Sequence, residues 1–104
     1  MPKINATEDV QLSQKKVKTK LPSMFKVIIL NDDYTPMEFV VDTIQRFFNK
    51  SFDEAKRIML RIHTEGLGVC GIFPQDIAET KMNQVLNYAK EHQHPLNCII
   101  ERVN

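Results

Sequence analysis

The sequence predicts an α+β domain in which a small three-stranded sheet packs with three helices, in the order β-α-α-β-α-β. Short runs rich in β-branched residues begin and end the region from residue 24 onward, and between them lie segments with apolar residues at every third or fourth position. With 104 residues and 42% hydrophobic content, the chain is long enough for one compact core. The sheet can be antiparallel or mixed, because the crossing topology cannot be read from the pattern.

The chain changes composition once, near residue 23. Residues 1–23 hold five lysines, two acidic residues and no aromatic residue, whereas all eight aromatic residues follow. The apolar residues of this first segment have no period, so burial cannot offset the entropy lost on ordering it. We therefore expect a flexible N-terminal extension over residues 1–23 and a core domain over residues 24–104.

The core begins with a strand that leads into a helix. Residues 24–30 are almost continuously apolar, which predicts a strand covered by helices, and the polar residues 31–33 predict a turn after it. The next four residues have the pattern of a capping box with proline at the first helical position. We expect the Thr35 side chain to cap the amide of Glu38, whose side chain reaches back.

The remaining elements follow the same logic. A second capping box, from Ser51 to Glu54, predicts a helix that Gly66 would end in a left-handed conformation. Glycines interrupt the short apolar run over 67–73, which favours a bulged strand. A third helix is predicted from about residue 74 to residue 91, and a last strand over 97–103.

Composition excludes several classes of function. A formal charge of +1 argues against nucleic acid as the main partner, since phosphate binding needs a concentrated basic face. No apolar run approaches the ~20 residues of a membrane span, so we expect a soluble, cytoplasmic protein. Cys70 and Cys98 form no disulfide framework, and His92, His94 and Cys98 lack a fourth metal ligand at a familiar spacing. We expect neither a metal nor a cofactor.

The acidic turn at residues 31–33 and His63 are the residues that suggest a binding site. The turn can simply complement the dipole of the helix that follows, or it can form an anionic cup for a small cation such as an amino group. His63 can be an ordinary residue near a helix end, or it can border the same cup. No spacing in the sequence shows whether the two lie side by side.

Enzymatic chemistry has weak support. No serine or cysteine stands in a recognised nucleophile motif, and neither cysteine adjoins a basic residue. Asp32, Asp33 and His63 could in principle form an acid/base site, which would make the protein a small hydrolase. The pattern is unspecific, and we expect no enzymatic activity.

One long segment carries a family resemblance. The stretch FKVIILNDDYTPMEFV at residues 25–40 resembles the signature of the ClpS adaptor family. Shorter matches follow in order over residues 59–63, 69–73, 78–81 and 94–96, so the resemblance spans essentially all of the predicted core.

This resemblance implies a non-enzymatic adaptor of the bacterial N-degron pathway. Such adaptors bind proteins whose N-terminal residue is Leu, Phe, Tyr or Trp and deliver them to the N-terminal domain of the ClpA unfoldase, part of the ClpAP protease. We expect a monomer, and the resemblance implies that its unstructured N-terminal extension takes part in the handover. The predicted β/α arrangement is also similar to the C-terminal domain of the ribosomal stalk protein. Another kind of interaction module therefore remains as an alternative.

The resemblance also assigns roles to residues. The free α-amino group of the substrate would be held by Asn31, Asp32 and His63. The pocket for the first side chain would be formed or edged by Asp33, Thr35, Met37, Val40, Met59, Ile62 and Leu96. Met37 would exclude β-branched side chains at the mouth, and Ile62 stands where the family often has valine. ClpA would be contacted by Asp76 and Lys81.

Overall fold

The computed structural model describes residues 22–103, and its elements follow the predicted order. They are β1 (Met24–Leu30), α2 (Met37–Phe48), α3 (Phe52–Glu65), β2 (Leu67–Pro74), α4 (Gln75–Glu91) and β3 (Asn97–Arg102). The predicted α+β class is confirmed. The predicted flexible extension lies, except for its last two residues, outside the described part of the chain.

The sheet is antiparallel throughout, with β1 between β2 and β3. The predicted irregularity in β2 is present: Gly71 pairs with Val27 while Val69 pairs with Ile28, so Cys70 is an extra residue between them. This two-against-one arrangement is a β-bulge, which bends the strand locally.

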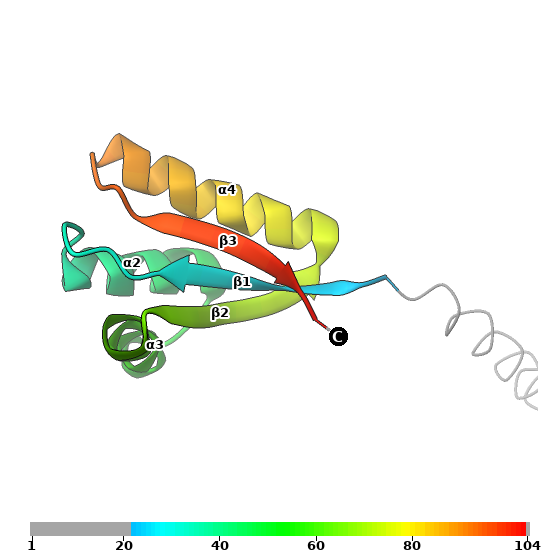
Figure 1. Cartoon of the computed structure of the whole chain (residues 1–104), viewed down its shortest axis with the longest axis horizontal. Coiled ribbons are helices and arrows are strands. Elements are labelled where there is room, and N and C mark those ends of the chain that lie inside the picture. Colours follow the sequence, from blue (N-terminus) through cyan, green and yellow to red (C-terminus); the bar gives the residue numbers. More distant parts are fainter. Residues whose placement is uncertain (1–21, 104) are drawn as a thin grey trace, which may run out of the picture.

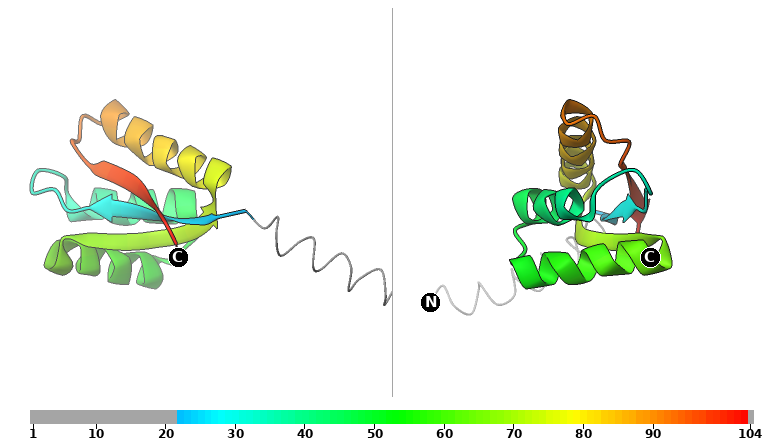
Figure 2. Two further views of the ribbon diagram at one scale, coloured as in Figure 1. Left: turned by 45° about the vertical axis from the view of Figure 1, so that its right-hand side comes forward. Right: turned by 90° about the vertical axis from the view of Figure 1, so that its left-hand side faces the viewer.

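All three helices cover one face of the sheet (Figures 1 and 2). Val27 and Ile29 of β1 point into this layer and are fully buried, together with Ile44 of α2 and Val85 of α4. The expectation that helices cover the first strand is therefore right for one face only. On the other face Ile28 is buried between its antiparallel neighbours, and none of the helices that the structure describes covers it.

The two predicted capping boxes have different outcomes. At α3 the box is complete: the Ser51 side chain accepts from the Glu54 amide, and the Glu54 side chain accepts from the Ser51 amide. At α2 the prediction was wrong, because Pro36 is the cap and makes no side-chain capping bond. The Thr35 hydroxyl donates instead to Asp32 Oδ2, at 2.7 Å.

A hydrogen bond joins two helices of the layer. The Tyr88 hydroxyl of α4 donates to Asp42 Oδ2 of α2 at 2.6 Å, and this hydrogen bond raises the pKa of the Tyr88 phenol.

Cys70 and Cys98 are free thiols on the core side, and burial raises the pKa of each to about 12. Thiols with so high a pKa stay protonated at neutral pH and act as small apolar side chains.

Candidate functional site

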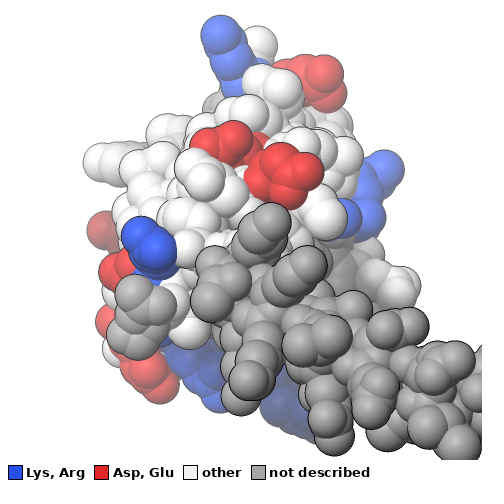
Figure 3. Space-filling view, turned by 90° about the vertical axis from the view of Figure 1, so that its right-hand side faces the viewer, with Lys and Arg blue, Asp and Glu red and all other residues white. Residues whose placement is uncertain are grey.

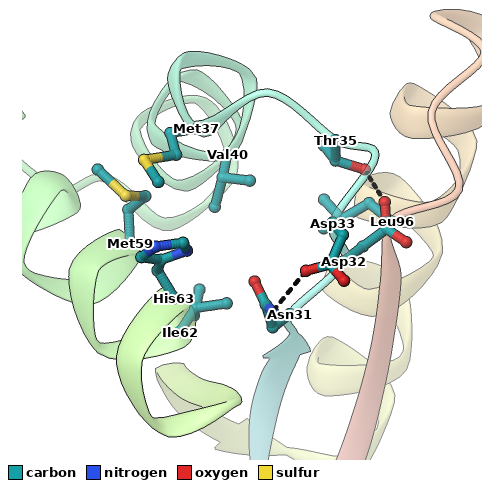
Figure 4. A pocket seen from close by; sticks show the side chains of 10 residues that line it. All are labelled: Asn31, Asp32, Asp33, Thr35, Met37, Val40, Met59, Ile62, His63 and Leu96. Carbon is teal, nitrogen blue, oxygen red and sulfur yellow. Dashed lines mark hydrogen bonds between the residues drawn. The ribbon is translucent and has the colours of Figure 1, made fainter.

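A pocket of about 100 Å³ opens at the end of the sheet where β1 stops. It collects every residue that the sequence analysis assigned to substrate binding, although these come from three separate segments of the chain (Figure 4). The lining consists of Asn31, Asp32, Asp33, Thr35, Met37, Val40, Met59, Ile62, His63 and Leu96.

One long-range hydrogen bond brings the acidic turn beside His63. The amide of Asn31, just after β1, donates to the carbonyl of Gly66 at 2.9 Å. Gly66 ends α3 with a φ of 92°, the left-handed conformation predicted for it, and its own amide donates to Ile62. The end of α3, which carries His63, is thereby fixed against the turn, and this answers the question that spacing left open.

The turn itself is ordered by local hydrogen bonds. Asp32 Oδ2 accepts from the Tyr34 amide at 3.1 Å and from the Thr35 hydroxyl at 2.7 Å. A long bond of 3.5 Å runs from Asn31 Nδ2 to Asp33 Oδ1. Both hydrogen bonds of Asp32 use the same oxygen, so Oδ1 keeps its acceptor capacity, as does the amide oxygen of Asn31.

Exposed polar residues lie on the rim and buried residues, apolar except for Thr35, form the floor. Asn31, Asp33 and His63 are exposed. The buried apolar residues that complete the lining are Val40, Met59, Ile62 and Leu96. Such a cavity can place an apolar side chain below a cation held at its mouth.

Met37 differs from the rest of the apolar lining because 45% of its surface is exposed. In Figure 4 its thioether lies beside that of Met59, on the α2 and α3 side of the pocket. Methionine is unbranched and flexible, so this wall can adjust to a ligand more easily than Val40 or Ile62 can.

Gly68 allows the floor to approach the sheet closely. A Cβ atom on Gly68 would lie 2.7 Å from Ile62 Cγ1 and 3.3 Å from the Ile58 carbonyl oxygen. Any larger residue would therefore displace Ile62, which lines the pocket. The sequence analysis found Gly68 as an interruption of the strand but missed this contribution to the site, since only the packed structure brings Gly68 and Ile62 together.

Asp76 and Lys81 lie away from the pocket, on the first half of α4. In Figure 1 α4 begins at the opposite end of the molecule from the turn that forms the pocket. Asp76 is exposed and lines a shallow hollow with Pro22, Pro74, Gln75 and Glu79. Figure 3 views this end and shows acidic side chains among uncharged ones.

Lys81 is less available than Asp76. Its ammonium donates to the carbonyl of Phe47 at 2.7 Å, which ties α4 to the end of α2. The structure thus gives Lys81 a structural contact, whereas among residues 22–103 the Asp76 carboxylate accepts only from the neighbouring Ile77 amide.

Within residues 22–103, no group of three or more His, Cys, Asp or Glu side chains is arranged to hold a metal ion. Over the same residues, no helix combines the length and the apolarity needed to cross a membrane.

Comparison with known proteins places the chain in a family. The family model for the ATP-dependent Clp protease adaptor protein ClpS matches residues 20–99. Proteins named ATP-dependent Clp protease adapter protein ClpS are similar to it. The one from Rhodospirillum centenum is 61% identical over 87 residues, covering 84% of this chain and 81% of the relative. The one from Parvibaculum lavamentivorans is 56% identical over 91 residues, covering 88% and 83%.

A solved structure is also similar. Agrobacterium tumefaciens ClpS2, bound to L-phenylalaninamide, is 39% identical with a TM-score of 0.77, and the match covers 79% of this chain and 99% of that one. On the family match, the relatives and the shared fold, the chain belongs to the ClpS family of ATP-dependent Clp protease adaptors.

Proposed function

We propose that this protein binds polypeptides whose N-terminal residue is Leu, Phe, Tyr or Trp and delivers them to the ClpA unfoldase of the ClpAP protease. The observation that carries the proposal is a single pocket with acceptor groups at its rim and a buried apolar floor. The N-terminal residue of a protein is the one residue that offers a cationic amino group and a side chain on the same carbon atom.

The rim suits an ammonium group. A free α-amino group has a pKa of about 7.7–8.0, so it is largely cationic at neutral pH and has three donors. In the proposal these donors go to the free oxygens of Asp32 and Asn31 and to a ring nitrogen of His63. Acetylation of the N-terminus removes the charge and two of the three donors, which would leave two of these acceptors without a partner.

The floor suits a large unbranched or aromatic side chain. Burying Leu or Phe contributes roughly 1.5–3 kcal/mol, enough for the first residue to dominate selection. In the proposal, the side chain passes Met37 and ends among Val40, Ile62 and Leu96. Ile and Val carry a second substituent on Cβ at the level of Met37, and we expect this extra width to be rejected.

The similar structure supports this assignment. L-phenylalaninamide, bound to Agrobacterium tumefaciens ClpS2, carries a free α-amino group and a phenylalanine side chain. Its amide occupies the place of the first peptide bond of a protein substrate. We infer a ligand of the same chemistry for the pocket described above.

The rest of the proposal concerns delivery. We propose that Asp76, with Lys81, contacts the N-terminal domain of ClpA, and that the protein acts in the cytoplasm as a monomer without a catalytic step of its own. The distance between the two sites supports this division, because the start of α4 lies at the opposite end of the molecule from the pocket (Figure 1). A bound substrate would leave the ClpA contact free.

One labelled peptide in three forms tests substrate binding. Fluorescence anisotropy is measured with N-terminal Leu, with N-terminal Ile and with acetylated Leu. We expect the free Leu form to bind at least about tenfold more tightly than the other two, because each of these loses a major interaction. Equal affinity for all three forms would contradict the proposal.

The ClpA contact has its own test. Asp76→Arg should weaken binding to the isolated ClpA N-terminal domain while leaving peptide affinity unchanged. Asp53→Arg is the matched control, since Asp53 is also an exposed aspartate in the first turn of a helix. If the two variants bind ClpA equally well, Asp76 has no part in the contact.

A further inference from the structure

A second hollow, of about 370 Å³, lies between α2 and α3 next to the pocket. We call it the α2–α3 groove. It is lined by Met37, Glu38, Val41, Asp42, Gln45, Phe52, Lys56 and Met59. Met37 and Met59 line both hollows, so the groove and the pocket share one flexible wall.

The groove offers apolar surface that the fold does not need for itself. Phe52, the first residue of α3, is 57% exposed and lies outside the buried core. Val41 and Met59 supply a buried floor. The carboxylate of Asp42 accepts from Tyr88 and lies 3.6 Å from Arg46, so its charge is already partnered. An exposed aromatic side chain above an apolar floor is typical of a surface that binds a partner.

The chemistry of the pocket rim indicates where a bound polypeptide leaves. If Asn31, Asp32 and His63 hold the amino group, the first carbonyl oxygen must leave the pocket on another side. That oxygen is an acceptor and gains nothing beside the carboxylates of Asp32 and Asp33. The exit over Met37, which is exposed at the mouth, leads away from these two carboxylates and into the α2–α3 groove, where the cationic Lys56 lines the wall together with Glu38.

The geometry of an extended chain selects the residue that the groove receives. Successive side chains of an extended chain point to opposite sides, so the first and third residues face the same surface. They are about 7 Å apart, since each residue advances the chain by about 3.3–3.4 Å. With the first side chain in the pocket, the second points to solvent and the third faces the neighbouring surface.

We propose that the α2–α3 groove is a second substrate subsite, which takes an apolar side chain at the third position of the bound polypeptide. The subsite rests on the function proposed above for the pocket and adds a preference beyond the first residue. The continuity of the two hollows through Met37 and Met59 is the observation that carries it.

Peptides that begin Leu-Gly-Gly, Leu-Gly-Leu and Leu-Leu-Gly test the subsite by fluorescence anisotropy. We expect Leu at the third position to tighten binding by about three- to tenfold, as partial burial of one side chain would. Leu at the second position should change affinity by less than about twofold, since that side chain faces solvent. Phe52→Ala should abolish the third-position preference without changing the affinity for Leu-Gly-Gly, and Phe52→Leu should restore most of it.

Leu60→Ala is the matched control, because Leu60 is an apolar residue of α3 with 44% exposure that lines neither hollow. It should keep the full third-position preference. The inference is overturned if the wild-type chain shows no such preference, if the preference lies at the second position, or if Phe52→Ala retains it. If the pocket does not recognise the free N-terminus, free and acetylated Leu-Gly-Gly will bind with equal affinity. That result contradicts the proposed function and is distinct from the three results above.

Discussion

The starts of α2 and α3 carry the same kind of sequence motif and use it for different purposes. At α3, Ser51 and Glu54 form both reciprocal bonds of a capping box, at 3.1 and 3.0 Å. At α2, Thr35 and Glu38 have the same spacing, but the helix begins without a side-chain cap. The Thr35 hydroxyl donates to the carboxylate of Asp32 instead.

The difference comes from the residues that precede each motif. A carboxylate three residues before Thr35 is a charged acceptor, and a hydrogen bond to a charged acceptor is stronger than one between neutral groups. This bond holds Asp32 in place at the rim of the pocket. We infer that the start of α2 gives up a capping interaction to order a binding site, whereas the start of α3 only stabilises the fold.

The largest expected effect comes from neutralising Asp32, the carboxylate that accepts from Thr35 just before α2. Asp32→Asn should weaken binding of a free Leu peptide by roughly tenfold or more, because a hydrogen bond to a charged group contributes about 1.5–3 kcal/mol. Glu54→Gln is the matched control and should leave peptide affinity unchanged. Anisotropy titration of both variants checks this, and an equal loss of affinity in the two would break the comparison.

Ser51→Ala should lower stability without affecting binding. Loss of a helix N-cap costs about 1 kcal/mol, which corresponds to roughly 4–8 °C in the melting temperature of a domain of this size. Thermal unfolding followed by circular dichroism measures the shift. A variant that melts normally but binds the peptide poorly would reverse the roles assigned to the two motifs.

Thr35→Val should have the opposite profile. It removes the hydroxyl that orders Asp32 and keeps the shape of the side chain, so we expect peptide binding to weaken by about 1 kcal/mol, or roughly fivefold. The melting temperature should change little, since Asp32 can be solvated by water. Titration and melting of the same sample separate the two effects, and a large drop in melting temperature would indicate that Thr35 supports the helix after all.

The smallest effect is the pH dependence of the α3 box. The backbone and side-chain hydrogen bonds from Ser51 lower the pKa of Glu54 below its ordinary value of 4.5. Its contribution to stability is therefore present above pH 4.5 and is lost as the pH falls through the lowered pKa of the folded state. Urea midpoints of the chain and of Glu54→Gln should differ at pH 7, and the difference should shrink as the pH falls below 4.5. A difference between the two urea midpoints that does not change with pH would contradict this assignment of Glu54.

Local patterns predicted most of the fold. The order of elements, the Ser51 box and the left-handed end at Gly66 depend on interactions within a few residues, and each is confirmed. The box at Thr35 was predicted wrongly because a local rule ignored the nearby carboxylate that competes for the hydroxyl. Coverage of β1 on one face only could not be read from its apolar run, since neighbouring strands also bury Ile28.

The site depended on information of another kind. Residue chemistry alone suggested the acidic turn at 31–33 and His63, but the family resemblance, and not the spacing, joined them to the apolar residues that the structure brings into the same pocket. What joins the turn to His63 is the bond from Asn31 to Gly66, which spans 35 positions and has no sequence pattern. The close approach of Gly68 to Ile62 and the groove beside Phe52 also arise only from packing between elements.

The central claim is that Asp32 recognises the charge of a free N-terminus. The most direct test compares the dissociation constants of the acetylated and free forms of one Leu peptide, on the wild-type chain and on Asp32→Asn. We predict a large ratio for the wild type, of at least about tenfold, and a much smaller ratio for the variant. A ratio that is unchanged by the substitution would contradict the account, because the free amino group would then be recognised by something other than Asp32.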